Sequence, residues 1–155
     1  MPIQSFSQSD FIGKGEKMDL LEFVQRHVKT KVDFDGAYGA QCVDLFRQYC
    51  KDVLGVPRTE SVKGAKDLAE RYRENPIEKG AFCLITDSRS CKAGDVAVWG
   101  ATKANPYGHV AIVLAVRPGG SLAVFEQDGF AQDGARLAWR DGNSAIGFLR
   151  AWEAV

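Results

Sequence analysis

The sequence lacks an excess of charge of either sign, because twenty Lys and Arg residues balance twenty Asp and Glu residues. This balance removes the electrostatic argument for a nucleic-acid or anionic-membrane partner. No apolar run is long enough to span a bilayer, and the N-terminus MPIQSFSQSD has neither the basic nor the apolar region of a secretion signal. We therefore expect a protein made in the cytoplasm without a signal peptide, with no nucleic-acid and no membrane partner.

The four cysteines lack the C-x-x-C spacing that would support a zinc site. Without a secretion signal, free thiols are the expected state. Cys50 lies eight residues after Cys42, and Cys83 lies in the apolar run AFCLIT, so both are expected to be buried small apolar residues. Only Cys42 requires a separate explanation.

The periodicity of apolar residues changes near residue 80. Before it, helical spacing occurs in 19–29, in 41–54 and in a shorter segment that begins at Ser61. After it come short segments rich in β-branched and aromatic residues, namely 82–86, 95–99, 109–116, 121–127 and 146–152. Helices followed by strands predict an α+β fold, with N-terminal helices packed on one antiparallel sheet. Residues 1–17 have no period and are expected to form an arm, which leaves a single domain at 18–155.

The segment HVAIVLAVRPGGSLAVFEQDG predicts a β-hairpin. With a two-residue turn at Pro118-Gly119, Glu126 lies opposite Ala111. In the same register Asp128 lies opposite His109. Opposed Cβ atoms are about 5 Å apart and diagonal ones about 7–8 Å, so the His109 side chain can reach either carboxylate. The alternative is a strand-end histidine that simply hydrogen-bonds a nearby acid.

Cys42 lies in the first turn of the predicted 41–54 helix. A helix N-terminus lowers the pKa of a thiol and favours the nucleophilic thiolate. A helix-start cysteine, a strand-start His109 and a carboxylate on the next strand are the components of a Cys-His-acid apparatus. Gln41 could donate a side-chain N–H to an oxyanion, beside the backbone N–H of Cys42. The alternative is a buried structural cysteine.

Asp33, Asp35 and Gly36 resemble the D-x-D-G opening of an EF-hand loop, although no Glu follows at the twelfth position. Taken alone, this pattern is compatible with a hard-cation loop and with an ordinary solvated turn.

Four segments, DFDGAYGAQCVDL, GDVAVW, YGHVAIV and VFEQDG, occur in this order and together resemble the CHAP family of cysteine, histidine-dependent amidohydrolases and peptidases. The sequence is most similar to the calcium-binding CHAP domains of bacteriophage endolysins, over most of the chain. The resemblance implies a papain-like CHAP fold. It also implies a bacteriolytic peptidoglycan hydrolase that cuts either the N-acetylmuramoyl-L-alanine amide or a bond in the peptide stem or cross-bridge.

The resemblance also assigns roles to individual residues. It makes Cys42 the nucleophile, His109 the general base and Glu126 the orienting acid. Gln41 matches the oxyanion residue. Asp128 stands where the endolysin branch commonly has Asn, so both acids stay candidates for orienting His109, and we favour Glu126.

A structural Ca²⁺ beside the nucleophile is a further implication of the resemblance. Oxygen ligands at alternate positions suit this large, hard ion. The implied ligands are the carboxylates of Asp33, Asp35 and Asp44 and the main-chain carbonyls of Ala37 and Gly39.

The implied partner is bacterial peptidoglycan, reached after release from the host cytoplasm, with a separate wall-binding domain or subunit left open. Tail-associated lysins and secreted effectors fit equally well. One alternative is a non-catalytic, calcium-dependent wall-binding module, which does not need Cys42 and His109 together. Another is an NlpC/P60-type cysteine peptidase, which does not need the D-x-D-G loop. Three aromatic residues near the predicted site either line a substrate groove or pack, namely Trp99, Tyr107 and Phe130.

Overall fold

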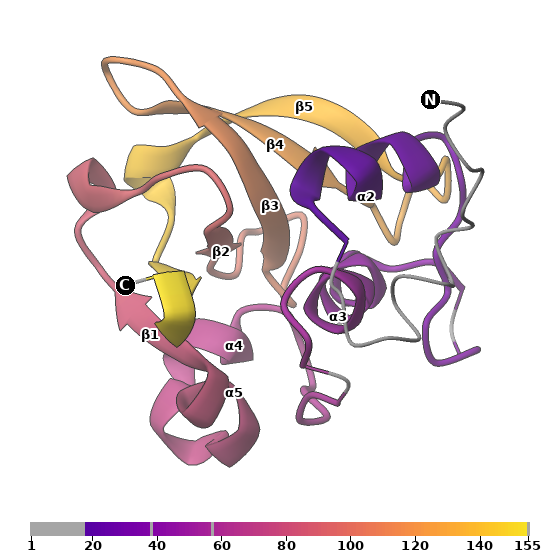
Figure 1. The fold of residues 1–155 in the computed structure, drawn as a ribbon, viewed down its shortest axis with the longest axis horizontal. Helices are drawn as coiled ribbons and strands as arrows, with labels where there is room; N and C mark the ends of the chain where they lie inside the picture. Colours follow the sequence, from indigo (N-terminus) through magenta and orange to yellow (C-terminus); the bar gives the residue numbers. More distant parts are fainter. Residues whose placement is uncertain (1–17, 38, 57, 155) are drawn as a thin grey trace, which may run out of the picture.

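The computed structural model describes residues 18–37, 39–56 and 58–154, and its centre is a six-stranded antiparallel sheet (Figure 1). The strand order is β1-β6-β2-β3-β4-β5. The strands are β1 Phe82–Ile85, β2 Val96–Trp99, β3 His109–Val116, β4 Ser121–Glu126, β5 Arg136–Asp141 and β6 Gly147–Ala151. With the helices that pack on this sheet, the predicted α+β class is confirmed. The predicted arm 1–17 lies outside the described residues.

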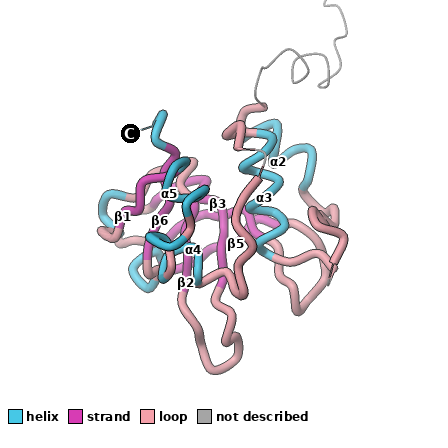
Figure 2. Tube along the Cα trace, turned by 90° about the horizontal axis from the view of Figure 1, so that it is seen from below, coloured by secondary structure: helices cyan, strands magenta, loops and turns pink. Residues whose placement is uncertain are grey.

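Two pairs of helices lie beside different parts of the sheet (Figure 2). Helices α2 (Leu20–His27) and α3 (Cys42–Asp52) lie together, and α3 contacts β3. Helices α4 (Asp67–Glu70) and α5 (Pro76–Ala81) contact β6 and β1, respectively. Among the described residues, no helix combines the length and apolar composition that a membrane crossing requires.

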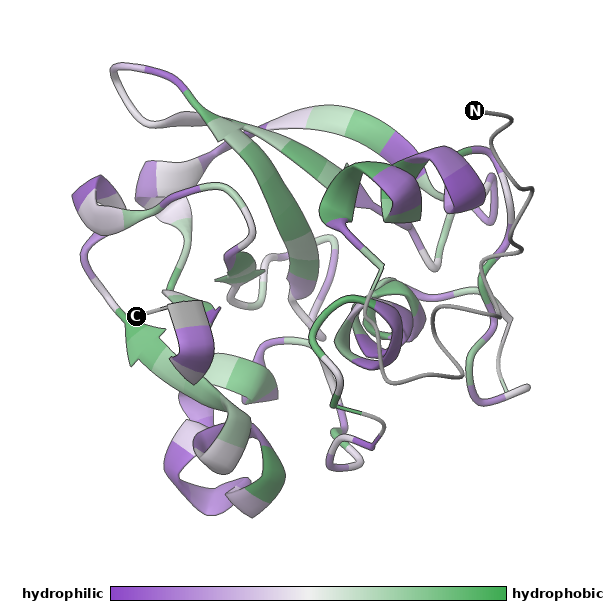
Figure 3. Cartoon of the chain, viewed as in Figure 1, coloured by the Kyte–Doolittle hydropathy of each residue, from purple (hydrophilic) through white to green (hydrophobic). Residues whose placement is uncertain are grey.

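Strand β3 separates two apolar clusters, and it is among the most hydrophobic elements (Figure 3). Val110 and Ile112 belong to the larger cluster, which includes side chains of α2 and α3. Ala111 and Val113 belong to the smaller one. Since side chains alternate between the faces of a strand, β3 is buried on both faces. It is therefore a rigid base for the histidine at its first position.

The hairpin differs from the prediction at its turn and agrees with it near the site. The backbone N–H of Arg117 donates to the carbonyl of Ser121 at 2.8 Å, so the loop has three residues instead of two. A register shift between Val113 and Ala115 then cancels this offset. Ile112 consequently pairs with Phe125 in the register that places Glu126 near the start of β3.

Three other elements differ from the prediction. The helix predicted from Ser61 begins only at Asp67, because the Lys66 backbone N–H donates to the carbonyl of Tyr107 at 3.0 Å rather than within a helix. Helix α5 and strand β5 were not predicted. Strand β5 matters most, because two of its arginines reach the candidate site.

Candidate active site

Cys42 is the first residue of α3, and its side chain is half-buried. The turn before it is fixed by Asp44, whose carboxylate accepts the backbone N–H of Gln41 at 2.9 Å. The backbone N–H of Asp44 in turn donates to the carbonyl of Gln41 at 3.0 Å. Gln41 itself is exposed. The thiol therefore lies at a fixed helix N-terminus with the Gln41 residue on the solvent side.

His109 and Glu126 are brought together by the β3–β4 pair. The Nε2 atom of His109 lies 3.0 Å from Oε1 of Glu126, whose side chain is 0% exposed. Gly108 precedes the histidine at φ 76°, and a Cβ there would meet the carbonyl oxygen of Trp99 at 2.4 Å. Glycine is therefore required at this close approach of β2 and β3.

The His109 ring also interacts with the side chain of Cys42. Burial opposes the charged imidazole, but the interactions with Cys42 and Glu126 prevail and raise the pKa of His109 to about 9. Because Nε2 faces Glu126, Nδ1 is the ring nitrogen that remains for the thiol. This arrangement favours the imidazolium form of His109 at neutral pH, beside a cysteine at a helix N-terminus.

Asp128 lies in the turn that follows β4. Its Oδ1 accepts the backbone N–H of Phe130 at 2.8 Å, and its Oδ2 lies 3.9 Å from Nη2 of Arg136. Within the described contacts, the carboxylate that meets His109 is that of Glu126. Asp128 is placed to shape the turn.

Two arginines of β5, which the sequence reasoning missed, bind Glu126. Arg140 donates from Nε to Oε1 at 2.6 Å and from Nη2 to Oε2 at 2.8 Å. Arg136 donates from Nη2 to Oε2 at 3.1 Å. Burial alone would raise the pKa of Glu126, but hydrogen bonds from His109 and Arg140 hold it well below its usual range. Glu126 is therefore ionised.

Two glutamines, also missed, tie the start of α3 to the segment that follows Glu126. Buried Gln127 accepts the Val32 N–H at 2.8 Å and donates to the carbonyls of Val32 and Gln41 at 2.7 and 2.9 Å. Gln132 accepts the Ala40 N–H at 3.2 Å and donates to the Ala40 carbonyl at 3.0 Å. Both ends of the 32–41 loop are thus attached to the segment that follows β4.

Three carboxylates lie close together, two from the 32–41 loop and one from α3. Ligand atoms of Asp33, Asp35 and Asp44 all lie within 4.8 Å of one another. Asp44 is 1% exposed. Its burial, and the nearby charges of Asp35 and Asp33, raise its pKa to about 6. A buried carboxylate beside two others is a donor set that fits a hard cation.

The remaining predicted ligands, Ala37 and Gly39, lie on the same loop. The Ala37 backbone N–H donates to Oδ1 of Asp35 at 2.9 Å. Gly36 and Gly39 have φ values of 70° and 75°, a left-handed conformation that glycine adopts at little cost. The two glycines allow the tight path that brings the aspartates together.

The aromatic residues near the site differ in exposure. Tyr107 and Phe130 are 53% and 67% exposed. Trp99 is half-buried, lies with its ring centroid 5.9 Å from that of His109, and donates from its indole N–H to the carbonyl of Asp141. Trp99 packs, whereas the other two have free ring surface for a substrate.

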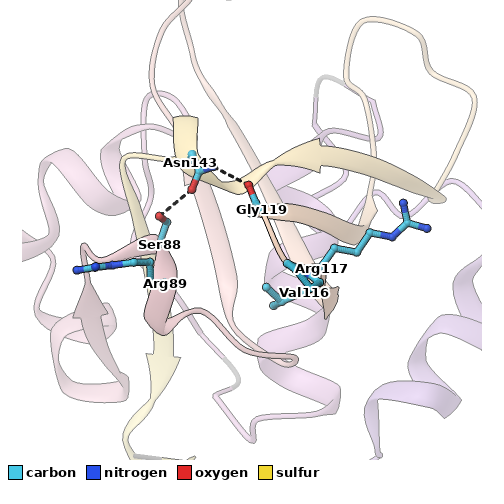
Figure 4. A pocket seen from close by; sticks show the side chains of 8 residues that line it. Ser88, Arg89, Val116, Arg117, Gly119 and Asn143 are labelled. Carbon is cyan, nitrogen blue, oxygen red and sulfur yellow. Dashed lines mark hydrogen bonds between the residues drawn. The ribbon is translucent and has the colours of Figure 1, made fainter.

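A pocket of about 510 Å³ lies elsewhere, at the far end of the β3–β4 hairpin (Figure 4). Its lining includes the hairpin tip, Ser88 and Asn143, whose side chain bonds both Ser88 and the carbonyl of Gly119. Val116 ends the strand that His109 begins, so the pocket lies about 23 Å from the histidine. None of its lining residues belongs to the candidate site.

An α+β fold that places a helix-start cysteine near a strand-start histidine and a buried carboxylate has the arrangement of the papain-like class of cysteine hydrolases. The chain belongs to the CHAP family, since the sequence profile of the CHAP domain matches residues 31–128. This agrees with the predicted family and not with the NlpC/P60 alternative.

Two relatives are phage proteins. The chain is 35% identical over 94 residues to the D-alanyl-L-alanine endopeptidase of Streptococcus phage B30, which covers 59% of this chain and 20% of that protein. It is 32% identical over 117 residues to endolysin PlyTW of Staphylococcus phage Twort, which covers 68% of this chain and 22% of that protein. The chain thus spans about a fifth of the length of these relatives.

Solved structures share the fold at low sequence identity. The wild-type endolysin LysIME-EF1 matches with a TM-score of 0.59 and 23% identity, over 94% of this chain and 64% of that one. An N-acetylmuramoyl-L-alanine amidase from Staphylococcus aureus matches with a TM-score of 0.54 and 16% identity, over 79% of this chain and 34% of that one.

Proposed function

We propose that this chain is the catalytic domain of an endolysin-like peptidoglycan hydrolase, which cleaves a cell-wall amide through Cys42. One observation carries the proposal: a half-buried thiol at a helix start interacts with His109, which an ionised, buried Glu126 holds in place by a hydrogen bond of 3.0 Å. The endopeptidase and endolysin named among the relatives support the choice of peptidoglycan as substrate.

In the proposed mechanism the Cys42 thiolate attacks the carbonyl carbon of the amide. The Cys42 backbone N–H and the Gln41 side chain stabilise the resulting oxyanion. The His109 imidazolium gives its proton to the leaving nitrogen, so that an amine departs and a thioester remains. His109 then takes a proton from water, whose oxygen attacks the thioester, so that a carboxylic acid is released and the Cys42 thiolate and the His109 imidazolium are restored. Glu126 stays ionised and orients the imidazole throughout.

The bond cleaved is either the N-acetylmuramoyl-L-alanine amide or a peptide bond of the stem or cross-bridge. The relatives and structural neighbours include both an endopeptidase and an amidase by name, so they support either bond. The exposed rings of Tyr107 and Phe130 are candidates for the walls of a substrate groove.

Calcium is part of the proposal. The carboxylates of Asp33, Asp35 and Asp44 would hold the ion, with the carbonyls of Ala37 and Gly39 completing its oxygen ligands. The bound ion would neutralise three converging negative charges and fix the loop that leads to Cys42. The proposed catalytic residues Cys42, His109 and Glu126 are not among these calcium ligands.

We also propose where the enzyme acts and what it binds. The enzyme acts on the cell wall after release from the cytoplasm of a phage-infected host, with peptidoglycan as its substrate. A wall-binding domain or subunit outside this sequence would supply affinity for the wall, as expected when the relatives are several times longer. The competing proposal is a calcium-dependent wall-binding module without catalysis.

The test is mass spectrometry of fragments released from several purified peptidoglycans in Ca²⁺. The wild type is compared with Cys42→Ala and with Cys83→Ala, a half-buried cysteine outside the site. New amino termini that disappear only in Cys42→Ala support the mechanism. A free amine on L-alanine indicates an amidase, and one inside the stem or cross-bridge indicates an endopeptidase. Equal binding by all three proteins without any released fragment would instead support the non-catalytic module.

A further inference from the structure

Glu126 has more cationic partners than an orienting acid requires. Its task in the proposed mechanism needs only the hydrogen bond with His109, yet two guanidinium groups also bind it. Arg136 and Arg140 are 40% and 36% exposed, so both lie at the solvent side of a carboxylate that is itself fully buried. The two arginines can therefore act on Glu126 from the solvent side.

The two arginines engage the carboxylate differently. Arg140 donates to Oε1 at 2.6 Å, the same oxygen that meets Nε2 of His109 at 3.0 Å. Its Nη2 also holds Oε2, so its planar fork fixes the rotation of the carboxylate. Arg136 reaches Oε2 alone, at 3.1 and 3.3 Å. A change at Arg140 therefore acts directly on the atom that orients His109, and a change at Arg136 acts only through the second oxygen.

The charged and titratable groups around Glu126 come from four directions. They are His109 of β3, Arg136 and Arg140 of β5, Asp128 and Asp133 of the turn after β4, and Cys42 of α3. The charge of Arg140 also interacts with those of Asp128 and Cys42. A positive charge at this place favours the deprotonated form of each neighbouring group.

We infer that Arg140 is a positioning residue that fixes the Glu126 carboxylate against His109 and thereby sets the pH range over which the imidazolium exists, with Arg136 as a weaker partner. Glu126 alone would stabilise the imidazolium strongly and delay its deprotonation at high pH. Arg140 shares the charge of Glu126, which moderates this effect on His109. The inference rests on the proposed function, since it assigns Arg140 a role in the Cys42–His109 pair.

The direct test is an NMR titration of the histidine Cε1 protons. The chain has two histidines, so a His27→Gln variant assigns both signals. Arg140→Met should raise the pKa of His109 by about 0.5 to 1 unit, as expected for the loss of one half-exposed charge a few ångströms away. Arg136→Met should raise it by less, and Arg140→Lys should stay close to the wild type because it keeps the charge.

The matched control is Arg117→Met. Arg117 stacks on Trp139 with its guanidinium carbon 3.9 Å from the ring centroid and makes no contact with Glu126 among the described interactions. This variant should leave the His109 titration unchanged. An equal shift in Arg117→Met and Arg140→Met would overturn the inference, because the effect would then be one of net charge.

A second readout is the pH profile of Cys42 alkylation by iodoacetamide, followed by mass spectrometry of the Cys42 peptide. The alkylation profile should move together with the His109 titration in Arg140→Met and should coincide with that of the wild type in Arg117→Met. If Arg140→Met lowers alkylation at every pH without moving either profile, its role is only structural and the inference is wrong. If that variant does not fold, an unchanged His109 titration in Arg136→Met overturns the inference as well.

These readouts do not depend on peptidoglycan cleavage. If the rate of Cys42 alkylation in the wild type does not change over the pH range in which His109 titrates, the proposed function is wrong. If the two are coupled but Arg140 does not influence them, only the present inference fails.

Discussion

Two buried carboxylates, Glu126 and Asp44, lie near Cys42, and their surroundings are opposite in charge. Glu126 is 0% exposed and is bound by His109 and two arginines. Asp44 is 1% exposed and faces two further aspartates. The pKa of Glu126 is held well below its usual range, whereas burial and the charges of Asp35 and Asp33 raise that of Asp44 to about 6.

Burial pushes both pKa values upward, so the difference comes from the neighbours. The fold supplies Glu126 with its own cations from β3 and β5. The aspartate group has an ion pair with Arg47, whose Nη1 lies 3.3 Å from Oδ2 of Asp35. The first site is electrostatically complete within the chain, whereas the proposed calcium ion would neutralise the second. Under the proposal, a reacting site built from side chains therefore lies next to a supporting site that holds an ion.

The largest effect is expected from Glu126→Gln, which removes the charge and nearly keeps the shape. It leaves Arg136 and Arg140 beside a neutral amide and His109 without its anionic partner. We expect a loss of hydrolysis of at least about 100-fold, with a loss of about 3 kcal/mol in the free energy of unfolding. Rates of peptidoglycan release and urea unfolding measure the two effects.

The matched control for this prediction is Asp128→Asn, at the other acid considered from the sequence. Its carboxylate contacts a backbone N–H and lies 3.9 Å from Arg136, so we expect at most a few-fold change in hydrolysis. A larger loss in Asp128→Asn than in Glu126→Gln would reverse the assignment of the orienting acid.

The second effect tests the aspartate group by removing calcium. A ligand present at 100 times its Kd stabilises the folded state by about 2.7 kcal/mol. For a chain of this size, EDTA should therefore lower the Tm by about 5 to 10 °C and slow hydrolysis, and Ca²⁺ should restore both. The measurement is thermal unfolding of the wild type and of Asp44→Asn in EDTA and in Ca²⁺.

Asp44→Asn should lose the response to Ca²⁺, while Asp87→Asn, an exposed aspartate outside the group, should keep it. A wild-type Tm and activity that are the same in EDTA and in Ca²⁺ would leave the aspartate group without a structural ion.

The two sites also differ in how far the sequence could predict them. The aspartates lie within a dozen residues of one another, and Cys42 and His109 each begin a regular element with a clear pattern. Strand β3 was predicted with its observed bounds because its apolar run is continuous. The sequence left Glu126 and Asp128 as candidates with Glu126 favoured, and the register near His109 agrees with the prediction because a β-bulge cancels the error in turn length.

The two arginines that bind Glu126 could not be predicted, because β5 exposes its apolar side chains and turns its charged ones toward the site. Its Arg136 and Arg140 turn toward the site, while Leu137 and Trp139 are 60% and 55% exposed. The only local signal was the spacing of two arginines on one face of a strand. Gln127 gave no signal at all, since it bonds Val32, which is 95 residues away in the chain.

A third prediction concerns alkaline pH and sharpens the description of the Glu126 site. The folded-state pKa of His109 is raised to about 9 from 6.5. Its contribution to stability is therefore fully present below pH 6.5 and is lost as the pH rises through about 9. We expect about 2 kcal/mol of stability to be lost over this range.

Urea unfolding at several pH values between neutral and alkaline measures this loss. His109→Gln should flatten the decline, and His27→Gln should retain it. A decline that is identical in wild type and His109→Gln would assign the effect to other groups.

The smallest effect is expected at the connection between the two sites. The Gln132 side chain makes two hydrogen bonds with the backbone of Ala40, two residues before Cys42. Its Nε2 also donates to the carbonyl of Gly129 at 2.7 Å. Gln132→Met keeps the length of the side chain and removes these hydrogen bonds, at about 1 kcal/mol in the free energy of unfolding. Because the 32–41 loop would be held less firmly, we expect hydrolysis to fall two- to three-fold and the Ca²⁺ concentration for half-maximal stabilisation to rise by about the same factor.

Calorimetric titration with Ca²⁺ measures the change in Ca²⁺ affinity. Gln48→Met, which removes a hydrogen bond to Asp52 within α3, is the control. If both variants change Ca²⁺ affinity equally, or if neither does, the two sites respond independently and Gln132 only packs the turn.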